Sequence, residues 1–485
     1  MTNVPGRSPS GVRLAGDEYQ HIVTWNEVLS ALRPESAVTA ITVEAPDAGN
    51  VDDIVTERRE GPPSYTQVKH AVDATSPVGA TWLMATPGGR RSLLGRFYDS
   101  WLELRTQGRE LEMQLVTDRE VDPSDDLMKL LDRRTELLVP AVMSSDPGII
   151  HARASWASHL ETDEDALLSM LAHLRFRTGR PYRSEAERAD ALMWGHGLAT
   201  GQNAIDSALA FVRDWVQERW RNLSVEKLRD RIHQRMERAG DPGALMVIEA
   251  IDDDLHPEDA TERLRWIERY EGDDPNLRRS LRDPQDWGAV IGPELAAAGQ
   301  RLRAAGHHRV LVRGAMRLPV WFAAGATLRH VQGFTVAGFQ QGSIWSSDDA
   351  TGTPTQAEVV IDRIGEGGDI AVAIGVAADP APAVARFVRE HALPVSTIAV
   401  LRPAGGPGPE AVSNSREAAL MAVGVRDAVR GLLEEHPTEQ IHLFLAVPGA
   451  LALLLGHRWN ALRPTVVYEH LGTGVGYVPT LEIPA

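Results

Sequence analysis

The pattern of apolar and polar residues divides the chain into three blocks, and each block is expected to fold differently. In residues 10–145, apolar residues recur at helical spacing over 16–33. The rest of this block reads as strands at 38–44, 52–58, 64–72 and 111–119, with a helix near 91–106. The order helix, three strands, helix, strand predicts an α/β domain with a mixed sheet.

The middle block, residues 146–242, is predicted to be a helical connector. Its apolar residues recur three and four positions apart, as around LLSML at 167–171, and charged residues occupy the remaining positions.

The third block, residues 243–485, alternates strand-like and helical segments. The strand-like runs are 245–251, 309–314, 334–340, 357–364, 369–376, 396–401, 441–447 and 465–471. Helical patterns lie between many of them, at 293–306, 381–392, 415–435 and 450–456. Alternating strands and helices predict open sheets with parallel strands, and two such series predict a pair of similar lobes.

The composition narrows the class of protein. The chain has 485 residues and no cysteine, which excludes disulfides, thiolate nucleophiles and cysteine-bound metals and fits a reducing cytoplasm. It has no run of about 18 apolar residues, so no membrane contact through a transmembrane helix is expected. Its N-terminal segment lacks the apolar stretch of a secretory signal.

The net charge of −17 restricts how this chain can bind nucleic acid. Such an acidic balance argues against a broad surface that coats DNA. Any contact with DNA should therefore be a local basic patch, or should arise when copies of the chain assemble.

A candidate catalytic cluster lies in the first block. Lysine occurs only at positions 69, 129 and 227, whereas arginine is used almost everywhere else. Gln67 and Lys69 are two apart on one predicted strand, so they share a face. The turn GPP at 61–63 brings the preceding strand, with Asp53 at its start, opposite them. Glu44 ends the strand before that and is expected to reach the same corner.

These residue types suit metal-assisted hydrolysis of a phosphodiester. Carboxylate and amide oxygens of Asp53, Gln67 and Glu44 are the ligands that Mg²⁺ or Mn²⁺ prefers. The compact ammonium of Lys69 can orient water or offset charge on phosphate. Strand phase alone does not decide whether Asp53 or its neighbour Asp52 faces the site. The competing interpretation is a sheet with exposed polar residues, in which Lys69 is a solvated charge.

The spacing of Asp53, Gln67 and Lys69 after a helix resembles the PD-(D/E)XK nuclease superfamily. The central Gln and the segment GDEYQH at 16–21 are similar to its Mrr-like restriction branch, and the resemblance covers roughly residues 10–120. It implies a restriction-endonuclease-like mixed sheet domain and a metal-dependent endonuclease that cuts double-stranded DNA. The family's central acid is replaced by Gln67, which leaves the metal affinity and the division of catalytic roles open.

In the third block, candidate ligand contacts follow the ends of strands. The stretch 339–349 places Trp345 beside Gln341, a pair suited to stacking on a base and reading its edge. The loop after 401 leads to Ser413, Asn414 and Arg416 at the start of a helix, where free N–H groups favour phosphate. Neither a dinucleotide-binding fingerprint nor a P-loop is present. Each loop taken alone is also compatible with an ordinary connection between a strand and a helix that binds no ligand.

The runs at 264–274, 316–331, 339–345 and 441–470 resemble a SAVED domain over residues 245–485. This resemblance implies two fused CARF-like Rossmann lobes that sense a cyclic oligonucleotide, such as a cyclic trinucleotide, in bacterial anti-phage signalling (CBASS). Nuclease, connector and SAVED domain in this order are similar to CBASS endonuclease effectors. The resemblance therefore implies a DNA nuclease that a second messenger activates, with homo-oligomerisation as the expected route.

Two other functions remain open at this stage. The chain could be a non-catalytic sensor with an inactive nuclease-like scaffold, an interpretation that Gln67 supports. It could also be a constitutive restriction nuclease that reads modified DNA. A target-reading domain should be basic, yet residues 401–485 hold six Arg against eight Asp and Glu, so this last alternative is the weakest.

Overall fold

The computed structural model describes residues 9–71, 76–106, 108, 110–138, 141–218, 222–472 and 474–485. The chain divides into two compact units. One comprises Met1–Met193 with Leu198–Ala239, and the other Trp194–Gly197 with Gly240–Ala485. In the part of the chain that is described, no helix combines the length and apolar character needed to cross a membrane.

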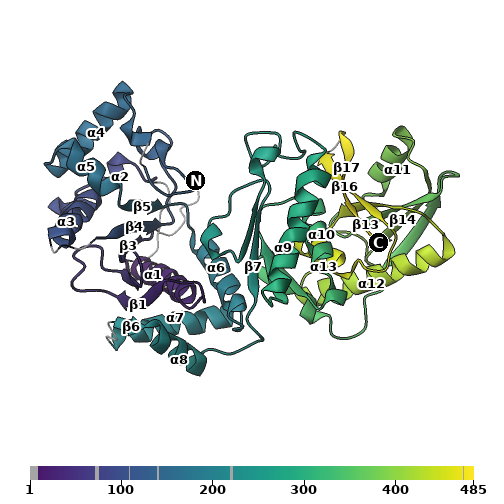
Figure 1. The fold of residues 1–485 in the computed structure, drawn as a ribbon, viewed down its shortest axis with the longest axis horizontal. Coiled ribbons are helices and arrows are strands. Elements are labelled where there is room, and N and C mark those ends of the chain that lie inside the picture. The colour runs from purple at the N-terminus through teal and green to yellow at the C-terminus, as the bar shows by residue number, and fades with distance from the viewer. Residues whose placement is uncertain are drawn as a thin grey trace. The chain divides into compact units, whose positions relative to one another are not determined.

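The first unit is built on a mixed sheet with the strand order β5-β4-β3-β2-β1-β6 (Figure 1). Its strands are β1 (Val38–Val43), β2 (Ile54–Arg58), β3 (Ser64–Lys69), β4 (Glu112–Thr117), β5 (Leu174–Arg177) and β6 (Asn222–Ser224). Strands β6, β1, β2 and β3 pair antiparallel in succession, whereas β3, β4 and β5 run parallel. The order of helix and strands predicted for this block is thus present.

Helices cover this sheet. They are α1 (Pro9–Ala31), α2 (Ala80–Leu83), α3 (Leu93–Thr106), α4 (Pro147–Leu160), α5 (Glu164–Leu171), α6 (Tyr182–Gly195), α7 (Gln202–Gln217) and α8 (Val225–Arg235). Apolar side chains of α3, α4 and α5 form one core with the sheet residues Val55, Tyr65 and Leu115. Helix α1 packs on β1 and β3 and also contacts α7. Because side chains alternate along a strand, residues 65, 67 and 69 of β3 face the side that α3 covers.

The expected helical connector is not a separate element. Strand β5 extends the first sheet beyond β4, and β6 extends it beyond β1. Helices α4 and α5 bury Trp156, Leu167 and Met170 in the core of the first unit. Strands this short carry little hydrophobic periodicity of their own, so the surrounding helical pattern conceals them.

The first lobe of the second unit contains β7 (Ala244–Glu249), β8 (Glu262–Arg265), α9 (Gly292–Ala304), β9 (Arg309–Arg313), α10 (Leu318–Thr327), β10 (Thr335–Gln340) and β11 (Ser343–Ser346). Its sheet has the order β11-β10-β9-β7-β8, and its strands are parallel except at the edge strand β11.

The second lobe contains β12 (Glu358–Arg363), β13 (Asp369–Gly375), α11 (Ala381–Glu390), β14 (Val395–Arg402), α12 (Ser415–Glu435), β15 (Ile441–Ala446), α13 (Gly449–Arg458), β16 (Thr465–Gly472) and β17 (Gly476–Ile483). Its sheet order is β12-β14-β13-β15-β16-β17, with parallel strands inside and antiparallel strands at both edges.

The two lobes share a core, so the paired parallel-sheet lobes that the sequence predicts are present. Helices α10 and α13 pack against each other, and buried side chains from both belong to one continuous cluster (Figure 1). The contact is close because each helix presents a glycine to the other. A Cβ on Gly325 would lie 2.0 Å from the main-chain oxygen of Leu453, and one on Gly456 would lie 2.0 Å from that of Phe322.

Candidate functional sites

Glu44, Asp53 and Gln67 form a row across neighbouring strands of the first unit. The register pairs the end of β1 with the start of β2, and the start of β2 with the middle of β3. One step beyond these pairs, Asp53 lies between Glu44 and Gln67, and the Glu44 N–H donates to the main-chain oxygen of Asp53 at 3.1 Å. Lys69 is two residues beyond Gln67 and therefore faces the same side of the sheet.

The carboxylate of Asp53 is the centre of this cluster. Its Oδ2 accepts hydrogen bonds from Gln67 Nε2 and, at 2.7 Å, from the Val68 N–H. Lys69 Nζ lies 4.0 Å from the same oxygen. The side chain of Asp53 is 16% exposed and that of Lys69 is 32% exposed, so both remain accessible from one side. The structure thus brings the predicted residues Asp53, Gln67 and Lys69 together.

Burial and the neighbouring charges shift the pKa values of Asp53 and Lys69 in opposite directions. Burial raises the pKa of Asp53, while Lys69 and the Val68 N–H oppose that rise. Burial likewise lowers the pKa of Lys69, and the charge of Asp53 opposes that fall. A carboxylate and an ammonium that stabilise each other in a partly desolvated place are the kind of pair found at functional sites.

The structure also separates the two neighbouring acids. Asp53 contacts Gln67 and Lys69 directly, whereas among the described residues the Asp52 side chain makes no hydrogen bond or ion pair with either and acts on Asp53 and Lys69 only through its charge. Glu44 is among the exposed residues. The part of its side chain that is buried raises its pKa most, and the charges of Asp53 and Asp52 raise it further. Asp53 is therefore the acid placed at the cluster, with Glu44 at its border.

The two sequence segments that resemble the nuclease family meet next to this cluster. His70, directly after Lys69, stacks on Tyr19 of the GDEYQH segment with ring centroids 5.2 Å apart. His70 Nδ1 also lies 2.8 Å from Asp118 Oδ2, after the end of β4. The Tyr19 hydroxyl donates to the main-chain oxygen of Arg180 at 2.7 Å. These contacts fix the end of β3, and with it the position of Lys69.

These side chains fit a divalent cation in a limited way. A carboxylate oxygen of Asp53 and the amide oxygen of Gln67 are hard donors that Mg²⁺ and Mn²⁺ accept. Gln67 presents its amide nitrogen to Asp53, so the amide must turn over to bring its oxygen to a shared ion. Across the described ranges, no group of three or more His, Cys, Asp or Glu is placed to hold a metal. A cation here would rely on Asp53, water and the phosphate beside it.

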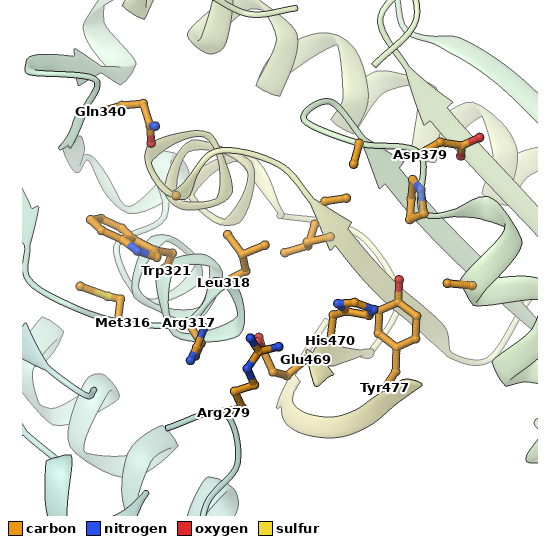
Figure 2. A pocket seen from close by; sticks show the side chains of 16 residues that line it. Arg279, Met316, Arg317, Leu318, Trp321, Gln340, Asp379, Glu469, His470 and Tyr477 are labelled. Atoms are coloured by element: carbon orange, nitrogen blue, oxygen red, sulfur yellow. The ribbon is translucent and has the colours of Figure 1, made fainter. Parts of the chain in front are cut away.

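The second unit contains a cavity of about 610 Å³ between its two lobes (Figure 2). Side chains of the first lobe, including Arg317 and Trp321, line one part of it. Glu469 and His470 of β16 and Tyr477 of β17 line another. The cavity lies beyond the carboxyl ends of β9, β10, β13 and β15, where ligands bind in open α/β sheets.

Two features of the cavity wall favour an anionic ligand. Helices α10, α11 and α13 begin at the cavity. In the described residues no side chain caps the first turn of α10, and a single side chain accepts from the first turn of α11 (Asp379) and of α13 (Gln340, from the Ala450 N–H at 3.5 Å). Free N–H groups at a helix start attract negative charge. Arg279 and Arg317 add two guanidinium groups to the wall. Opposing them are Asp379, which accepts from the Ala381 N–H at 3.0 Å, and the buried Glu469.

None of the residues predicted to bind ligand is among the described residues that line this cavity. Trp345 is only 1% exposed, because its ring belongs to the core shared by both lobes, so it cannot stack on a base. Gln341 is exposed in the turn between β10 and β11, with a positive φ of 53°. The neighbouring Gln340 lines the cavity instead.

The segment predicted to hold phosphate caps a helix instead. The side chain of Asn414 accepts from the Glu417 N–H at 3.0 Å, and Ser413 donates through its N–H and hydroxyl to the Glu417 carboxylate. Arg416 is exposed outside the cavity. The binding roles predicted for Gln341, Trp345, Ser413, Asn414 and Arg416 therefore have no support from this arrangement.

Sequence reasoning did not identify the residues that do line the cavity. Arg317 of the first lobe lies far in the sequence from Glu469 and Tyr477, which are neighbours on the β16–β17 hairpin, and only the packing of the two lobes brings Arg317 to them. The sequence did contain one indication of these residues: Arg317 and Glu469 lie close to the carboxyl ends of predicted strands, where ligands bind in open α/β sheets.

Residues 293–483 match the family of the SAVED domain, described as the SMODS-associated and fused to various effectors sensor domain. The C-terminal part of the chain is therefore a SAVED sensor domain, as the sequence predicts. The chain as a whole is homologous to CD-NTase-associated protein 4 of Enterobacter hormaechei subsp. hoffmannii (strain UCI 50). That relative is 23% identical over 509 residues, which cover 94% of this chain and 95% of the relative.

Solved structures of Cap4 SAVED/CARF-domain containing receptors are also similar. The Acinetobacter baumannii receptor with the cyclic trinucleotide 2'3'3'-cAAA is 15% identical, with a TM-score of 0.44 and complete coverage of both chains. The Moraxella osloensis receptor is 15% identical, with a TM-score of 0.40, and covers 97% of this chain and 99% of that chain. These likenesses are too remote to assign any residue of the present chain.

Proposed function

We propose that this protein is a DNA endonuclease that a cyclic oligonucleotide switches on, as an effector of anti-phage defence. The first unit hydrolyses phosphodiesters of double-stranded DNA, and the SAVED domain binds the activating ligand. The observation that carries the nuclease proposal is the meeting of Asp53, Gln67 and Lys69 at one accessible corner of a mixed sheet.

Each residue of the cluster has a role in this proposal. Asp53, together with the amide oxygen of Gln67 once that amide has turned over and with Glu44 at the border, would hold Mg²⁺ or Mn²⁺ beside water and the phosphate. Such an ion would lower the pKa of a water and offset charge on the phosphate. Lys69 donates from its ammonium to the phosphate or to the attacking water, and Asp53 keeps that ammonium in place. His70 and Tyr19 fix the end of β3 on which Lys69 lies.

The cavity of the SAVED domain is the proposed ligand site. A cyclic oligonucleotide carries one negative charge per phosphate, which suits helix starts and the two arginines in the wall. The relatives include receptors whose structures hold a cyclic trinucleotide, and we propose a ligand of that class here. The aromatic groups of Trp321 and Tyr477 are available at the wall to contact bases.

The proposal is tested by incubating the full chain with supercoiled plasmid and Mg²⁺, with and without candidate cyclic trinucleotides. We expect nicked and linear DNA only when both ligand and metal are present, and no cleavage with EDTA. Asp53→Asn serves as the catalytic control, because it keeps the shape of the side chain and removes its charge. Cleavage that persists in EDTA, or in Asp53→Asn, would contradict the assigned site.

A non-catalytic sensor is the second candidate. Gln67 stands where the related nucleases carry an acid, and the described residues offer no cluster of three metal-binding side chains. This candidate predicts ligand binding without cleavage under every metal tested. Ligand binding measured on the same preparation as plasmid cleavage separates the two candidates.

A further inference from the structure

Glu469 is a buried acid in the wall of the cavity that has no partner among the residues that the structure describes. It lies on β16, lines the cavity and is 7% exposed. In the part of the chain that is described, its carboxyl group makes no hydrogen bond or ion pair, and apart from burial only the charges of Arg317 and Arg279 act on it. Burying a charge without a partner is costly, so such a group either becomes neutral or awaits a ligand.

Two arginines, Arg279 and Arg317, lie close to Glu469 (Figure 2), but both donate their hydrogen bonds to main-chain oxygens. Arg317 donates from Nε and Nη2 to the main-chain oxygen of Arg278 at 2.9 and 2.8 Å. Arg279 donates to the main-chain oxygen of Leu471 at 2.9 Å. Their charges reach Glu469 through space without forming the bidentate contact that would keep it ionised.

The other titratable groups around Glu469 cannot replace that contact. Tyr270 is buried, and its hydroxyl has no partner among the described residues. Burial raises the pKa of both Tyr270 and Tyr477, and Glu469, when ionised, adds to the rise. His470 also lines the cavity. Burial and the charge of Arg279 lower its pKa, so its imidazole is mostly neutral even at the ordinary pKa of histidine and cannot offer Glu469 a positive charge at neutral pH. Burial raises the pKa of Glu469 to about 8, which leaves its carboxyl group protonated at neutral pH.

We propose that Glu469 binds as a neutral acid and reads a base of the cyclic oligonucleotide, an inference that rests on the proposed ligand class. A protonated carboxyl group presents one donor beside one acceptor. Adenine and cytosine present the complementary pair, a basic ring nitrogen that accepts and an adjacent amino group that donates. A ring nitrogen is a stronger acceptor than a carbonyl oxygen, so the acid proton is best placed opposite it.

The opposite protonation state would favour a different base. An ionised carboxylate has two acceptors and matches the ring N–H and amino group of guanine. In this cavity, burial disfavours the ionised form, and the phosphates of a bound ligand disfavour it further because like charges repel. The site is therefore selective for adenine or cytosine, and ligand binding should require the proton on Glu469.

The test uses the full chain and three named probes: cyclic triadenylate, cyclic tricytidylate and cyclic triguanylate. Their affinities are measured by calorimetry at about pH 7 and about pH 9. For the adenine or cytosine probe we expect affinity to fall by up to about tenfold per pH unit above the pKa of Glu469. The first two probes decide between the two bases. Binding near the pKa should also take up protons, which calorimetry in two buffers of different ionisation enthalpy reports.

Glu469→Gln separates a base-reading role from a structural one. Its amide keeps one donor and one acceptor at every pH, so affinity should be retained while the pH dependence and the proton uptake disappear. Glu469→Ala should lose affinity at every pH. Glu482→Gln, which makes the same change at an exposed position of β17, should leave the wild-type pH dependence unchanged.

Distinct outcomes would overturn this inference and the proposed function. If cyclic triguanylate alone binds, or if affinity is the same at both pH values in wild type and Glu469→Gln, Glu469 does not read a base as a neutral acid. The sensor function would survive either result. If no cyclic trinucleotide binds at either pH, the proposed ligand class fails, and the role of Glu469 fails with it.

Discussion

At the scale of single residues, Lys69 allows a sharp test, because the chain has lysine at only three positions. Lys69→Ala should lower ligand-activated DNA cleavage by roughly 100-fold or more, since one donor to the reacting group is lost. Lys69→Arg should also be poor, because a planar guanidinium cannot replace a compact ammonium 4.0 Å from Asp53. Initial rates of plasmid nicking measure both changes.

The matched control is Lys129→Ala. That lysine pairs with Asp126 on the surface, its side chain is 43% exposed, and cleavage should remain at the wild-type rate. Full activity in Lys69→Arg would mean that a positive charge suffices at this position and that lysine is not specifically required.

The two adjacent acids should differ in effect. Asp53→Asn should remove metal-dependent cleavage, because it neutralises the carboxylate that contacts Gln67, Val68 and Lys69. Asp52→Asn should retain most activity, because Asp52 affects the cluster only through its charge. Cleavage rates over a range of Mg²⁺ concentrations compare the variants. An inactive Asp52→Asn together with an active Asp53→Asn would reverse this assignment.

Glu469 should also make the stability of the fold depend on pH. Its pKa is about 8 in the folded protein against an ordinary value of 4.5. The protonated form therefore stabilises the fold fully below about pH 4.5, and this stability is lost as the pH rises to about 8. At about pH 8, Glu469→Gln should raise the free energy of unfolding by on the order of 2 kcal/mol. Denaturant unfolding at pH 5 and 8 measures it, and a gain that is no larger at the higher pH would contradict it.

At the scale of elements, the contact between α10 and α13 places the starts of both helices at the cavity. Gly456→Ala should destabilise the second unit by about 3 kcal/mol, because the new Cβ would lie 2.0 Å from the main-chain oxygen of Phe322. Ligand affinity should fall as well, since the helices must move apart. Gly431→Ala on α12 is the control. No atom lies within 4 Å of a Cβ there, and a gain of up to about 1 kcal/mol is expected from helix propensity.

The elements show how far the sequence could predict this molecule. The row of Glu44, Asp53 and Gln67 could be predicted, because hairpin strands close in sequence fix their own neighbours through side-chain alternation. The strands β5 and β6 could not, because three or four residues carry no clear period. Trp345 shows the limit for single side chains. An aromatic residue in an edge strand has the same sequence signal whether its ring faces ligand or core.

The SAVED cavity could not be predicted from local sequence patterns, for a related reason. Its wall combines residues from 279 to 477, and the packing of two lobes decides which strand ends meet. The family resemblance located the domain, but the helix start that Asn414 caps resembled an anion site as much as the start of α13, where Pro448 at the N-cap has no side-chain acceptor. Whether a helix start is free depends on its side-chain cap, which only the folded structure reveals.

At the scale of the whole molecule, the acidic charge of −17 and the proposed cleavage of DNA have to be reconciled. Few phosphates can be neutralised by one copy of the chain, so its affinity for DNA at physiological salt should be low. If several copies assemble on one DNA, each copy adds its own basic residues near Lys69, so the assembly neutralises more phosphates than one chain does. A ligand can drive such assembly only if it binds the assembled state more tightly than the single chain. Assembly is therefore the step at which the ligand would control cleavage.

This reasoning predicts that ligand-induced assembly and cleavage rise together. Light scattering should detect larger species when a cyclic trinucleotide is added to the full chain, over the same concentrations at which plasmid nicking appears. Arg279→Ala should shift both curves to higher ligand concentration, because it removes a positive charge from the cavity wall. Arg416→Ala should shift neither, because that equally exposed arginine lies outside the cavity. Asp53→Asn should assemble normally and fail to cut, since its change lies in the nuclease cluster. Activation of a chain that stays monomeric would disprove gating by assembly, even if the ligand and the nuclease are both assigned correctly.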